Sequence, residues 1–458
     1  MDKLNLNVSH IHLIGIGGSG MYPIVQILRS LNYNVSGSDV EDGATLNRVR
    51  DLGVKVYIGQ SSSNLEGAEL VVYSAAISKE NPELQAAIQK QLKLFTRAEF
   101  LGLISQQYKN SICISGTHGK TTTSALLTQI LLKTGHNPGV VVGGVLPLIN
   151  GSGCVGDLNT FVCEACEFSN TFLNLNSNIS IVLNIDNDHL EFFGSMDNLI
   201  ASFKQFCSQT KNLIIYNGDD KNTKIAVSDV TIPKISFGLN EDNDYYAKNI
   251  TESGFRQTSF DLFHKAEKLV TITYHIPGNH NVYNVLAACV AALHANVAAE
   301  ELPNAVSEFY GAARRFEILY ESPELAIVDD YAHHPTEIKA TLKAAKQTHY
   351  KNIWAIFQPF TYSRTAALLK DFADVLKLAD HCVITDIMGS RETNTLGIHA
   401  QALVDLISNA KYISNFDDIC EYIIKNVPQN TLVITLGCGN IYKVSHKLAQ
   451  QLKGEKNE

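Results

Sequence analysis

The sequence predicts an α/β protein of three domains. Apolar strands alternate with helices along most of the 458 residues, a pattern typical of parallel sheets covered by helices. Strand, glycine turn and helix follow one another at residues 10–31 and again at 111–131, and such junctions are typical of nucleotide-binding domains. The chain is also too long for one core, and its length corresponds to about three domains of ordinary size.

The composition is that of a globular protein, with 45% apolar and 18% charged residues. The net charge of -9, with no basic block, argues against nucleic-acid binding. The N-terminus lacks a secretion-signal pattern, and no apolar run approaches membrane-spanning length, so we expect a cytoplasmic protein without a membrane partner. Nine cysteines, an odd number, predict reduced thiols. Cys163 and Cys166 lack the second pair that a zinc site needs.

The first domain, predicted over residues 1–105, has a Rossmann-like pattern. A strand from His10 leads to a helix over Met21–Leu31 through a turn that contains Gly15, Gly17, Gly18 and Gly20. The next strand, Asn34–Ser38, ends in Asp39, about where a dinucleotide fold places an acidic residue on a ribose. The turn indicates a site for a nucleotide pyrophosphate, and a nicotinamide cofactor is one alternative.

The rest of this domain continues the alternation. Its predicted elements are helices over Thr45–Leu52, Pro82–Gln91 and Arg97–Ser105 and strands over Lys55–Ile58 and Leu70–Ser74.

The second domain, predicted over residues 106–313, begins with the motif SGTHGKTTT. A strand over residues 112–114 enters a turn between Gly116 and Gly119, and Lys120 opens a helix that reaches Leu131. Free N–H groups at the helix start suit phosphate, Lys120 can reach the outer phosphates, and the Thr121 hydroxyl can bind magnesium. The usual phosphate loop has four residues between its glycines and this turn has two, so a tight turn with an incidental lysine is the alternative.

Two acidic clusters follow at predicted strand ends. The run FVCEACE carries Glu164 and Glu167, and the strand over residues 181–185 ends in Asp186, Asp188 and His189. Oxygen ligands with one imidazole suit Mg²⁺ or Mn²⁺ bridging phosphates. Ordinary polar loops are the alternative.

Between Ile235 and Tyr274 the hydrophobic period shifts towards two, which predicts an antiparallel excursion. Its segments are Tyr245–Ile250, Phe255–Phe263 and Leu269–Tyr274. The motif GNHNVYN then enters a helix to His294, on which Asn281 and Asn284 lie three residues apart on one face. Their amides suit a purine edge, and a helix cap is the alternative.

The third domain, predicted over residues 314–458, has a second Rossmann-like pattern. A strand over Leu325–Val328 leads into DDYAHHP, and Pro335 starts a helix. Ligands bind at the carboxyl ends of such strands. The further predicted elements are strands over Ile353–Phe357, His381–Ile387 and Thr431–Leu436, and helices from Arg364, over Ile398–Ile407 and from Asn440.

Taken in order, the motifs resemble the Mur ligase family over essentially the whole chain. They are GIGGSGM, SGTHGKTTT, NIDNDHLE, GNHNVYN, ARRF, DDYAHHPTE and FQPFTYSRT. Within the family, HIHLIGIGGSGM, VYSAAI and DYAHHPTE resemble a member that adds L-alanine. The resemblance implies an ATP-dependent enzyme of peptidoglycan precursor synthesis, which joins L-alanine to the lactyl carboxylate of UDP-N-acetylmuramate through an acyl phosphate.

The resemblance also implies a role for each motif. The UDP-sugar site would contain the four glycines of the first turn with Asp39, Ser74 and Arg97. The ATP site would contain Gly116, Thr117, His118, Gly119, Lys120, Thr121, Thr122, Asn281, Asn284, Arg315 and Asp330, with Asp330 on the ribose. Magnesium would be held by Thr121, Glu164 and His189. The amino acid would meet Tyr331, His333 and Arg364.

Phosphoryl transfer to a carboxylate needs charge neutralisation and alignment, for which Lys120, Arg315 and metal ions are suited. His333 is a candidate acceptor for the amine proton. Because Arg315 and Arg364 lie on a different domain from Lys120, we predict that the third domain closes onto the second before the reaction.

One departure from the family pattern concerns the amino-acid loop, where Phe360 and Thr361 replace the histidine and arginine common after Gln-Pro. Arg364 remains to pair with a carboxylate. The preference for L-alanine over glycine or L-serine is therefore less firmly predicted than the reaction. Alternatives are a related ligase that adds a tripeptide or another amino acid, an NAD-dependent dehydrogenase, and a non-catalytic nucleotide-binding protein. The sequence makes no prediction of oligomeric state.

Overall fold

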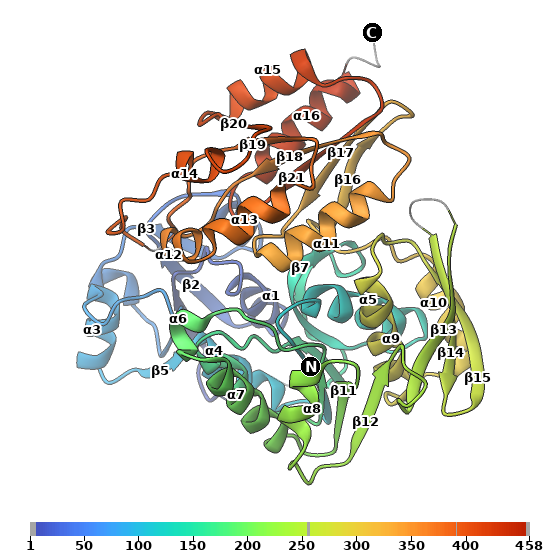
Figure 1. Cartoon of the computed structure of the whole chain (residues 1–458). Coiled ribbons are helices and arrows are strands. Elements are labelled where there is room, and N and C mark those ends of the chain that lie inside the picture. The colour runs from blue at the N-terminus through green and yellow to red at the C-terminus, as the bar shows by residue number, and fades with distance from the viewer. Residues whose placement is uncertain (1–5, 254–256, 391, 455–458) are drawn as a thin grey trace. The chain divides into compact units, whose positions relative to one another are not determined.

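A computed structural model describes residues 6–253, 257–390 and 392–454 (Figure 1). The chain divides into two compact units. The first comprises Met1–Asn249, Phe260–Ile272 and Tyr283–Ser307, and the second comprises Ile250–Ser259, Thr273–Val282 and Glu308–Glu458. Three sheets with flanking helices confirm the predicted α/β fold. The predicted domain boundaries at 105/106 and 313/314 stay predictions.

The first sheet is parallel and has the order β3-β2-β1-β4-β5. This order reverses direction between β1 and β4, and ligands of such folds bind beyond the carboxyl ends of the strands at that point. The strands are β1 His10–Ile14, β2 Asn34–Asp39, β3 Lys55–Ile58, β4 Leu70–Tyr73 and β5 Lys93–Thr96. The helices are α1 Tyr22–Ser30, α2 Ala44–Asp51, α3 Pro82–Gln89 and α4 Arg97–Ser105, with a 3₁₀ turn at Ser62–Leu65.

The second sheet has the order β15-β14-β13-β12-β11-β10-β6-β9-β7-β8. Its strands are β6 Asn110–Ser115, β7 Gly139–Leu146, β8 Gly151–Cys154, β9 Thr160–Glu164, β10 Ile179–Val182, β11 Leu213–Asn217, β12 Lys234–Gly238, β13 Tyr245–Ser253, β14 Gln257–His264 and β15 Glu267–Tyr274. Its helices are α5 Lys120–Lys133, α6 Leu190–Phe193, α7 Met196–Ser208, α8 Lys221–Val227, α9 His280–Leu293 and α10 Leu302–Ser307. Further 3₁₀ turns occupy Pro147–Ile149, Phe168–Asn174 and Ala299–Glu301.

Two expectations for this sheet were wrong. The antiparallel excursion does not begin at Ile235, because β12 pairs parallel with β11 and β13 pairs parallel with β12. The strand expected over 181–185 ends at Val182, so Asp186 and His189 lie on a loop beyond it. Phe255, where one predicted segment began, lies outside the described residues.

The third sheet has the order β16-β17-β21-β18-β19-β20 and is parallel except for β16, which runs antiparallel to β17. The strands are β16 Glu317–Glu321, β17 Leu325–Asp330, β18 Asn352–Phe357, β19 His381–Ile384, β20 Ala410–Tyr412 and β21 Thr431–Leu436. The helices are α11 Pro335–Lys346, α12 Tyr362–Ala367, α13 Leu369–Leu376, α14 Gln401–Val404, α15 Phe416–Asn426 and α16 Tyr442–Gly454.

The helix predicted over Ile398–Ile407 is confined to α14. After α14 the N–H groups of Leu406 and Ile407 donate to carbonyls three residues back, so the chain continues as turns instead of an α-helix. Further along, Asn409 Nδ2 donates to the carbonyls of Ala379 and Asp380, at 2.8 and 2.9 Å. The strand predicted over His381–Ile387 likewise ends at Ile384, where its pairing with β20 ends.

Alternate residues of the third sheet enter two separate cores. Val328, Ile434 and Phe357 belong to one core, whereas Ile327, Val433 and Ile356 belong to the other. A sheet buried on both faces explains the continuous apolar strands of the sequence.

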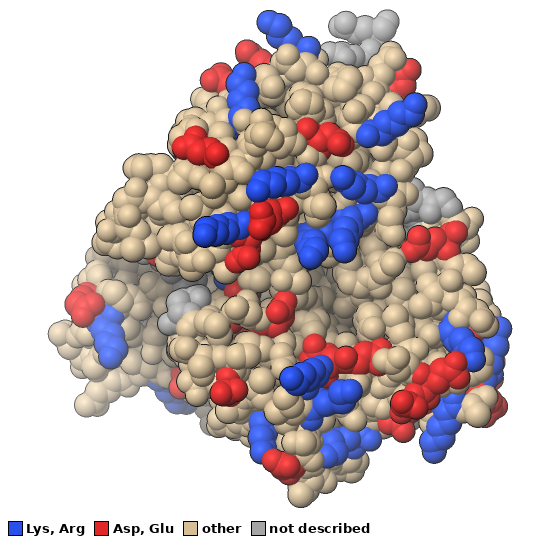
Figure 2. Space-filling view, in the orientation of Figure 1, with Lys and Arg blue, Asp and Glu red and all other residues tan. Residues whose placement is uncertain are grey.

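Lysine and arginine side chains are interspersed with acidic ones over the visible face (Figure 2). All nine cysteines are free thiols, as predicted. Among the described residues, no helix is both long and apolar enough to cross a membrane.

Candidate functional site

The turn between β6 and α5 requires glycine at its end. Gly119 has φ +89° and precedes the first residue of α5. A Cβ atom there would lie 2.2 Å from Asn284 Oδ1 on α9, so both the backbone angle and the available space exclude a side chain. The turn therefore presents the backbone N–H groups at the start of α5, which is the arrangement that binds anions.

Lys120 is held at this turn by a carboxylate. Its Nζ donates to the carbonyls of Gly116 and Thr117 and to Glu167, whose two oxygens lie 2.9 and 3.1 Å away. The Glu167 side chain is only 2% exposed. Burial alone would lower the pKa of Lys120, but the negative charges of Glu167 and Glu164 outweigh it and raise that pKa. Lys120 therefore stands ready as an ammonium group.

Glu164 lies at the end of β9, beside the first turn of α5. Its Oε2 accepts from Thr121 Oγ1 at 3.1 Å, and its Oε1 accepts from Ser124 Oγ at 3.2 Å and from the Gly143 N–H at 2.6 Å. A carboxylate beside a hydroxyl is a donor set that suits Mg²⁺. The structure thus brings together two of the three predicted metal ligands, Thr121 and Glu164.

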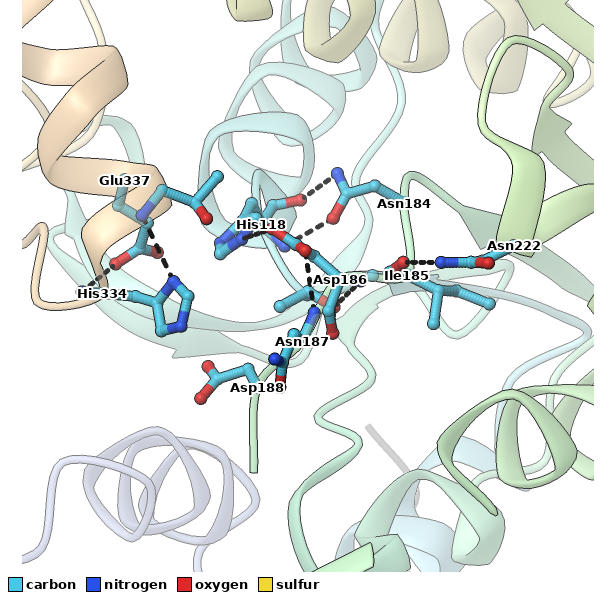
Figure 3. Close-up of polar contacts among 12 residues, drawn as sticks. His118, Asn184, Ile185, Asp186, Asn187, Asp188, Asn222, His334 and Glu337 are labelled. Carbon is cyan, nitrogen blue, oxygen red and sulfur yellow. Dashed lines mark hydrogen bonds and ion pairs between the residues drawn. The ribbon is translucent and has the colours of Figure 1, made fainter. Parts of the chain in front are cut away.

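The loop after β10 holds the turn at residues 116–119 between β6 and α5, which we call the phosphate turn because it is predicted to bind phosphate (Figure 3). Asn184 Oδ1 accepts the N–H of His118 at 2.8 Å, and Asn184 Nδ2 donates to the His118 carbonyl at 3.0 Å. His118 Nε2 lies 3.2 Å from Asp186 Oδ2, and the Asp186 N–H donates to Thr117 Oγ1 at 2.9 Å. Asn222 in turn holds the carbonyl of Ile185 at 2.8 Å. This loop therefore fixes the conformation of the turn.

His189, the third predicted metal ligand, has φ +57° at the start of α6. Its Nε2 lies 3.7 Å from Asp188 Oδ2, and its ring lies 4.8 Å from that of Phe168. Within the described residues, the one trio of carboxylate and imidazole groups with metal-binding spacing is Glu317, Asp329 and His446, which does not include the predicted ligands.

The two asparagines predicted for the adenine side have different contacts. Asn281 Nδ2 donates to the carbonyl of Pro277 at 2.7 Å, which lies before the start of α9. Asn284 Oδ1 accepts from Thr123 Oγ1 at 3.5 Å and stands against Gly119. The structure therefore places Asn284 at the phosphate turn itself.

The first glycine turn, after β1, gathers the residues predicted for the UDP-sugar. The N–H of Gly17 donates to Asp39 Oδ2 at 2.8 Å. A Cβ at Gly15 would lie 3.2 Å from Ser74 Cβ, and one at Gly20 would lie 3.3 Å from the Arg97 side chain. Gly18 closes the turn, since its N–H donates to the Gly15 carbonyl at 3.2 Å.

In the second unit, Asp330 organises the loop that carries Arg315. The buried Asp330 carboxylate accepts the N–H groups of Phe316 and Ala332, at 2.8 and 2.7 Å. Burial raises its pKa to about 6, although Arg315 acts in the opposite direction. The guanidinium of Arg315 lies 5.0 Å from the centre of the Tyr331 ring.

Arg314, which was not among the predicted site residues, makes several polar contacts in this loop. Its guanidinium pairs with Asp329 at 3.0 Å and donates to the carbonyls of Gly437 and Gly439, at 2.6 and 3.2 Å. It also lies between the rings of Tyr331 and Tyr442. The doubled arginine of ARRF was the only signal in the sequence.

The residues predicted for the amino acid form an aromatic group. The ring of His333 makes edge contacts with Tyr331 and Phe360, at centroid distances of 5.5 and 6.5 Å. His333 Nδ1 lies 3.3 Å from Glu337 Oε2. The same oxygen accepts the His334 N–H at 3.3 Å, and Figure 3 shows Glu337 beside His334. Arg364 lies on α12, and its N–H donates to the helix cap Thr361.

Family models match three consecutive parts of the chain. They are described as Mur ligase family, catalytic domain, over residues 10–109; Mur ligase middle domain, over 114–292; and Mur ligase, glutamate ligase domain, over 314–439.

Curated relatives match over nearly the full length. The UDP-N-acetylmuramate--L-alanine ligase of Caldicellulosiruptor bescii is 42% identical over 94% of this chain and 96% of its own. The ligase of the same name from Lachnospira eligens is 42% identical over 98% of this chain and 100% of its own.

Solved structures agree. A UDP-N-acetylmuramate-alanine ligase from Thermotoga maritima is similar with a TM-score of 0.83 at 26% identity, over 97% of this chain and 99% of that one. A murein peptide ligase from Psychrobacter arcticus has a TM-score of 0.76 at 25% identity, over 97% and 98%.

Proposed function

The chain belongs to the Mur ligase family, and on that premise we propose that it joins L-alanine to the lactyl carboxylate of UDP-N-acetylmuramate with hydrolysis of ATP. The observation that carries this proposal is the match, over 94% of the chain and at 42% identity, to a relative named for that reaction. The product would be a peptidoglycan precursor, and the by-products would be ADP and phosphate.

ATP is proposed to bind with its phosphates at the turn before α5. The N–H groups of the helix start, the ammonium of Lys120 and the hydroxyl of Thr121 support this placement. The position of the Asn284 amide against Gly119 supports a role for this residue in the same site.

Magnesium is proposed to be held by Thr121 and Glu164, with His189 as a further candidate ligand. The hydroxyl and carboxylate oxygens, 3.1 Å apart, fit the cation's preference for oxygen. When bound, the cation would neutralise phosphate charge during transfer.

The proposed chemistry has two steps. A carboxylate oxygen of the UDP-sugar attacks the γ-phosphorus, the bond to ADP breaks, and an acyl phosphate forms. The amine nitrogen of L-alanine then attacks the acyl carbon, and phosphate leaves with the bonding electrons. Lys120 and Arg315 would stabilise the phosphoryl charge, Arg364 would bind the amino-acid carboxylate, and His333 would accept the amine proton.

A second candidate is a ligase that adds a preformed peptide to the UDP-sugar. It is favoured by the structural similarity to the Psychrobacter murein peptide ligase. Phe360 beside His333 does not distinguish the two candidate functions, since an aromatic ring can border L-alanine or a peptide.

The test is phosphate release from ATP and magnesium, with UDP-N-acetylmuramate and L-alanine together and with each omitted. We expect release only with both, and a product heavier by one alanyl residue. Glycine, L-serine and an L-alanyl tripeptide are the comparison acceptors. Release with the tripeptide alone would establish the second candidate, and no release with any acceptor would refute both.

A cytoplasmic location is proposed on the strength of the nine free thiols. Free thiols persist in reducing compartments.

A further inference from the structure

Helix α1, which follows the first glycine turn, packs tightly on strand β8. Gln26 of α1 is 9% exposed, and its Oε1 accepts the N–H groups of Ser152 and Gly153, both at 3.0 Å. A Cβ at Gly151 would lie 2.0 Å from Gln26 Nε2, and one at Gly153 would lie 2.5 Å from the Pro23 carbonyl. The two elements therefore touch without intervening side chains from β8.

The contact continues from β8 to Glu164. Strand β8 pairs with β7, where Gly153 stands opposite Val141. The register then breaks between Val141 and Leu146. Inside this irregular stretch, the Gly143 N–H donates to Glu164 Oε1 at 2.6 Å. A bulge releases an N–H from the strand ladder, and here that group holds the carboxylate proposed to bind magnesium.

We propose that Gln26 is a positioning residue for the ligation, because it fixes the first glycine turn relative to Glu164 and the phosphate turn. This inference rests on the proposed function, in which the two turns hold the UDP-sugar and ATP. The lactyl carboxylate and the γ-phosphate must then meet in line, and a displacement of about 1 Å costs about 100-fold in rate. Gln26 touches neither reacting group in this scheme.

The experiment compares Gln26→Met and Gln26→Glu in the full chain. The methionine variant keeps the side-chain length but cannot accept the two hydrogen bonds, and the glutamate variant keeps an oxygen that can accept both. The matched control is Tyr108→Phe, which removes a buried hydrogen bond of 2.7 Å to the Val155 carbonyl, just after β8, and leaves the hydrogen bonds of Gln26 in place.

We expect Gln26→Met to lower kcat about 10- to 100-fold, as misalignment does. The Kd values for UDP-N-acetylmuramate and for a non-hydrolysable ATP analogue, each measured alone, should stay close to those of the wild type. Gln26→Glu should recover most of the rate, and Tyr108→Phe should keep it. Should Gln26→Met fail to fold, Gln26→Asn, whose amide is one methylene shorter, should give the same division between kcat and Kd.

An unchanged kcat in Gln26→Met would overturn the proposal. So would an equal loss in Tyr108→Phe, or a parallel loss of both affinities, since these would indicate a merely structural role.

Hydrogen exchange separates this inference from the proposed function. UDP-N-acetylmuramate should slow exchange at residues 15–31 in all variants. At residues 139–155 it should slow exchange only in proteins with glutamine or glutamate at position 26. A wild type that binds this ligand without ligating would refute the proposed function, and the exchange at 139–155 would still decide on Gln26.

Discussion

At the scale of single residues, the buried charged side chains are already paired with protein groups in the structure. Lys120 and Glu167 form such a pair at the site. Outside the site, Glu83 of α3 forms a second buried group with His12, Ser38 and Asn64. Removing one member of such a pair leaves the other buried and uncompensated, which is costly. Ion pairs on the exposed surface contribute little to the free energy of unfolding, so removing one of their members costs less.

The first prediction concerns Lys120. Lys120→Ala should lower kcat for phosphate release by about a thousandfold or more, because a group that stabilises transferred charge is lost. Glu167→Gln removes the charge that raises the pKa of Lys120, so the alkaline fall of kcat should move to lower pH. A pH profile of phosphate release measures both. Lys109→Ala, on the exposed side of the chain just before β6, is the control and should match the wild type.

A second prediction concerns acid stability. Burial would raise the pKa of Glu83, but the nearby His12 ring, 3.6 Å away, and hydrogen bonds from Ser38 and Asn64 lower it below 4.5. A lowered pKa means that the ionised group stabilises the fold above pH 4.5, and that this contribution is lost as the pH falls through the folded-state pKa.

Glu83→Gln should therefore cost about 1 to 3 kcal/mol of unfolding free energy at pH 7. The difference from the wild type should shrink below pH 4.5. Urea unfolding at both pH values tests this. A difference that stays constant with pH would contradict the role of the ionised carboxylate.

At the scale of elements, helix α5 has a glycine with a positive φ beside each of its ends. Gly119 and Gly135 flank it, with φ +89° and +80°. A Cβ would collide with Asn284 at Gly119, but would meet nothing within 4 Å at Gly135. The two glycines thus form a matched pair that separates backbone strain from crowding at the phosphate turn.

The third prediction uses this pair. Gly135→Ala should cost about 1 to 2 kcal/mol, the price of a left-handed alanine, and leave nucleotide binding intact. Gly119→Ala should cost more and abolish binding of a non-hydrolysable ATP analogue, because Asn284 must move. Calorimetry and thermal unfolding of both variants measure the difference. Equal behaviour of the two variants would show that the contact with Asn284 is unimportant.

At the scale of the whole molecule, the proposed reaction draws on both units. Lys120 and Glu164 belong to the first unit, and Arg315 and Arg364 belong to the second. In the proposed reaction these groups act on the same substrates, so we predict that the third domain closes onto the second before the reaction.

The fourth prediction is that substrates make the molecule more compact. Small-angle scattering with UDP-N-acetylmuramate and an ATP analogue should give a smaller radius of gyration than scattering without ligands. Arg315→Ala should weaken the effect, whereas Arg48→Ala, on α2, should not. Profiles that do not change with ligands would count against closure.

Much of the fold could be predicted because strongly apolar strands and capped helices have recognisable patterns within short stretches of sequence. The predicted bounds of Lys55–Ile58, Arg97–Ser105 and Thr431–Leu436 are those of β3, α4 and β21. Strands β5, β7, β8, β11, β16 and β20 were not predicted. Of these, β5, β8, β16 and β20 have three to five residues at or near a sheet edge, and so short a strand carries little periodicity.

The sequence by itself determined the family, the two glycine turns and the order of the motifs, because each depends on residues adjacent in the chain. Only the tertiary structure decided the partners. Glu167 holds Lys120 across 47 residues, Asn184 braces His118 across 66, and Gln26 reaches Ser152 across 126. Such contacts arise from strand order and helix packing, and no local pattern encodes which distant groups they bring within hydrogen-bonding distance.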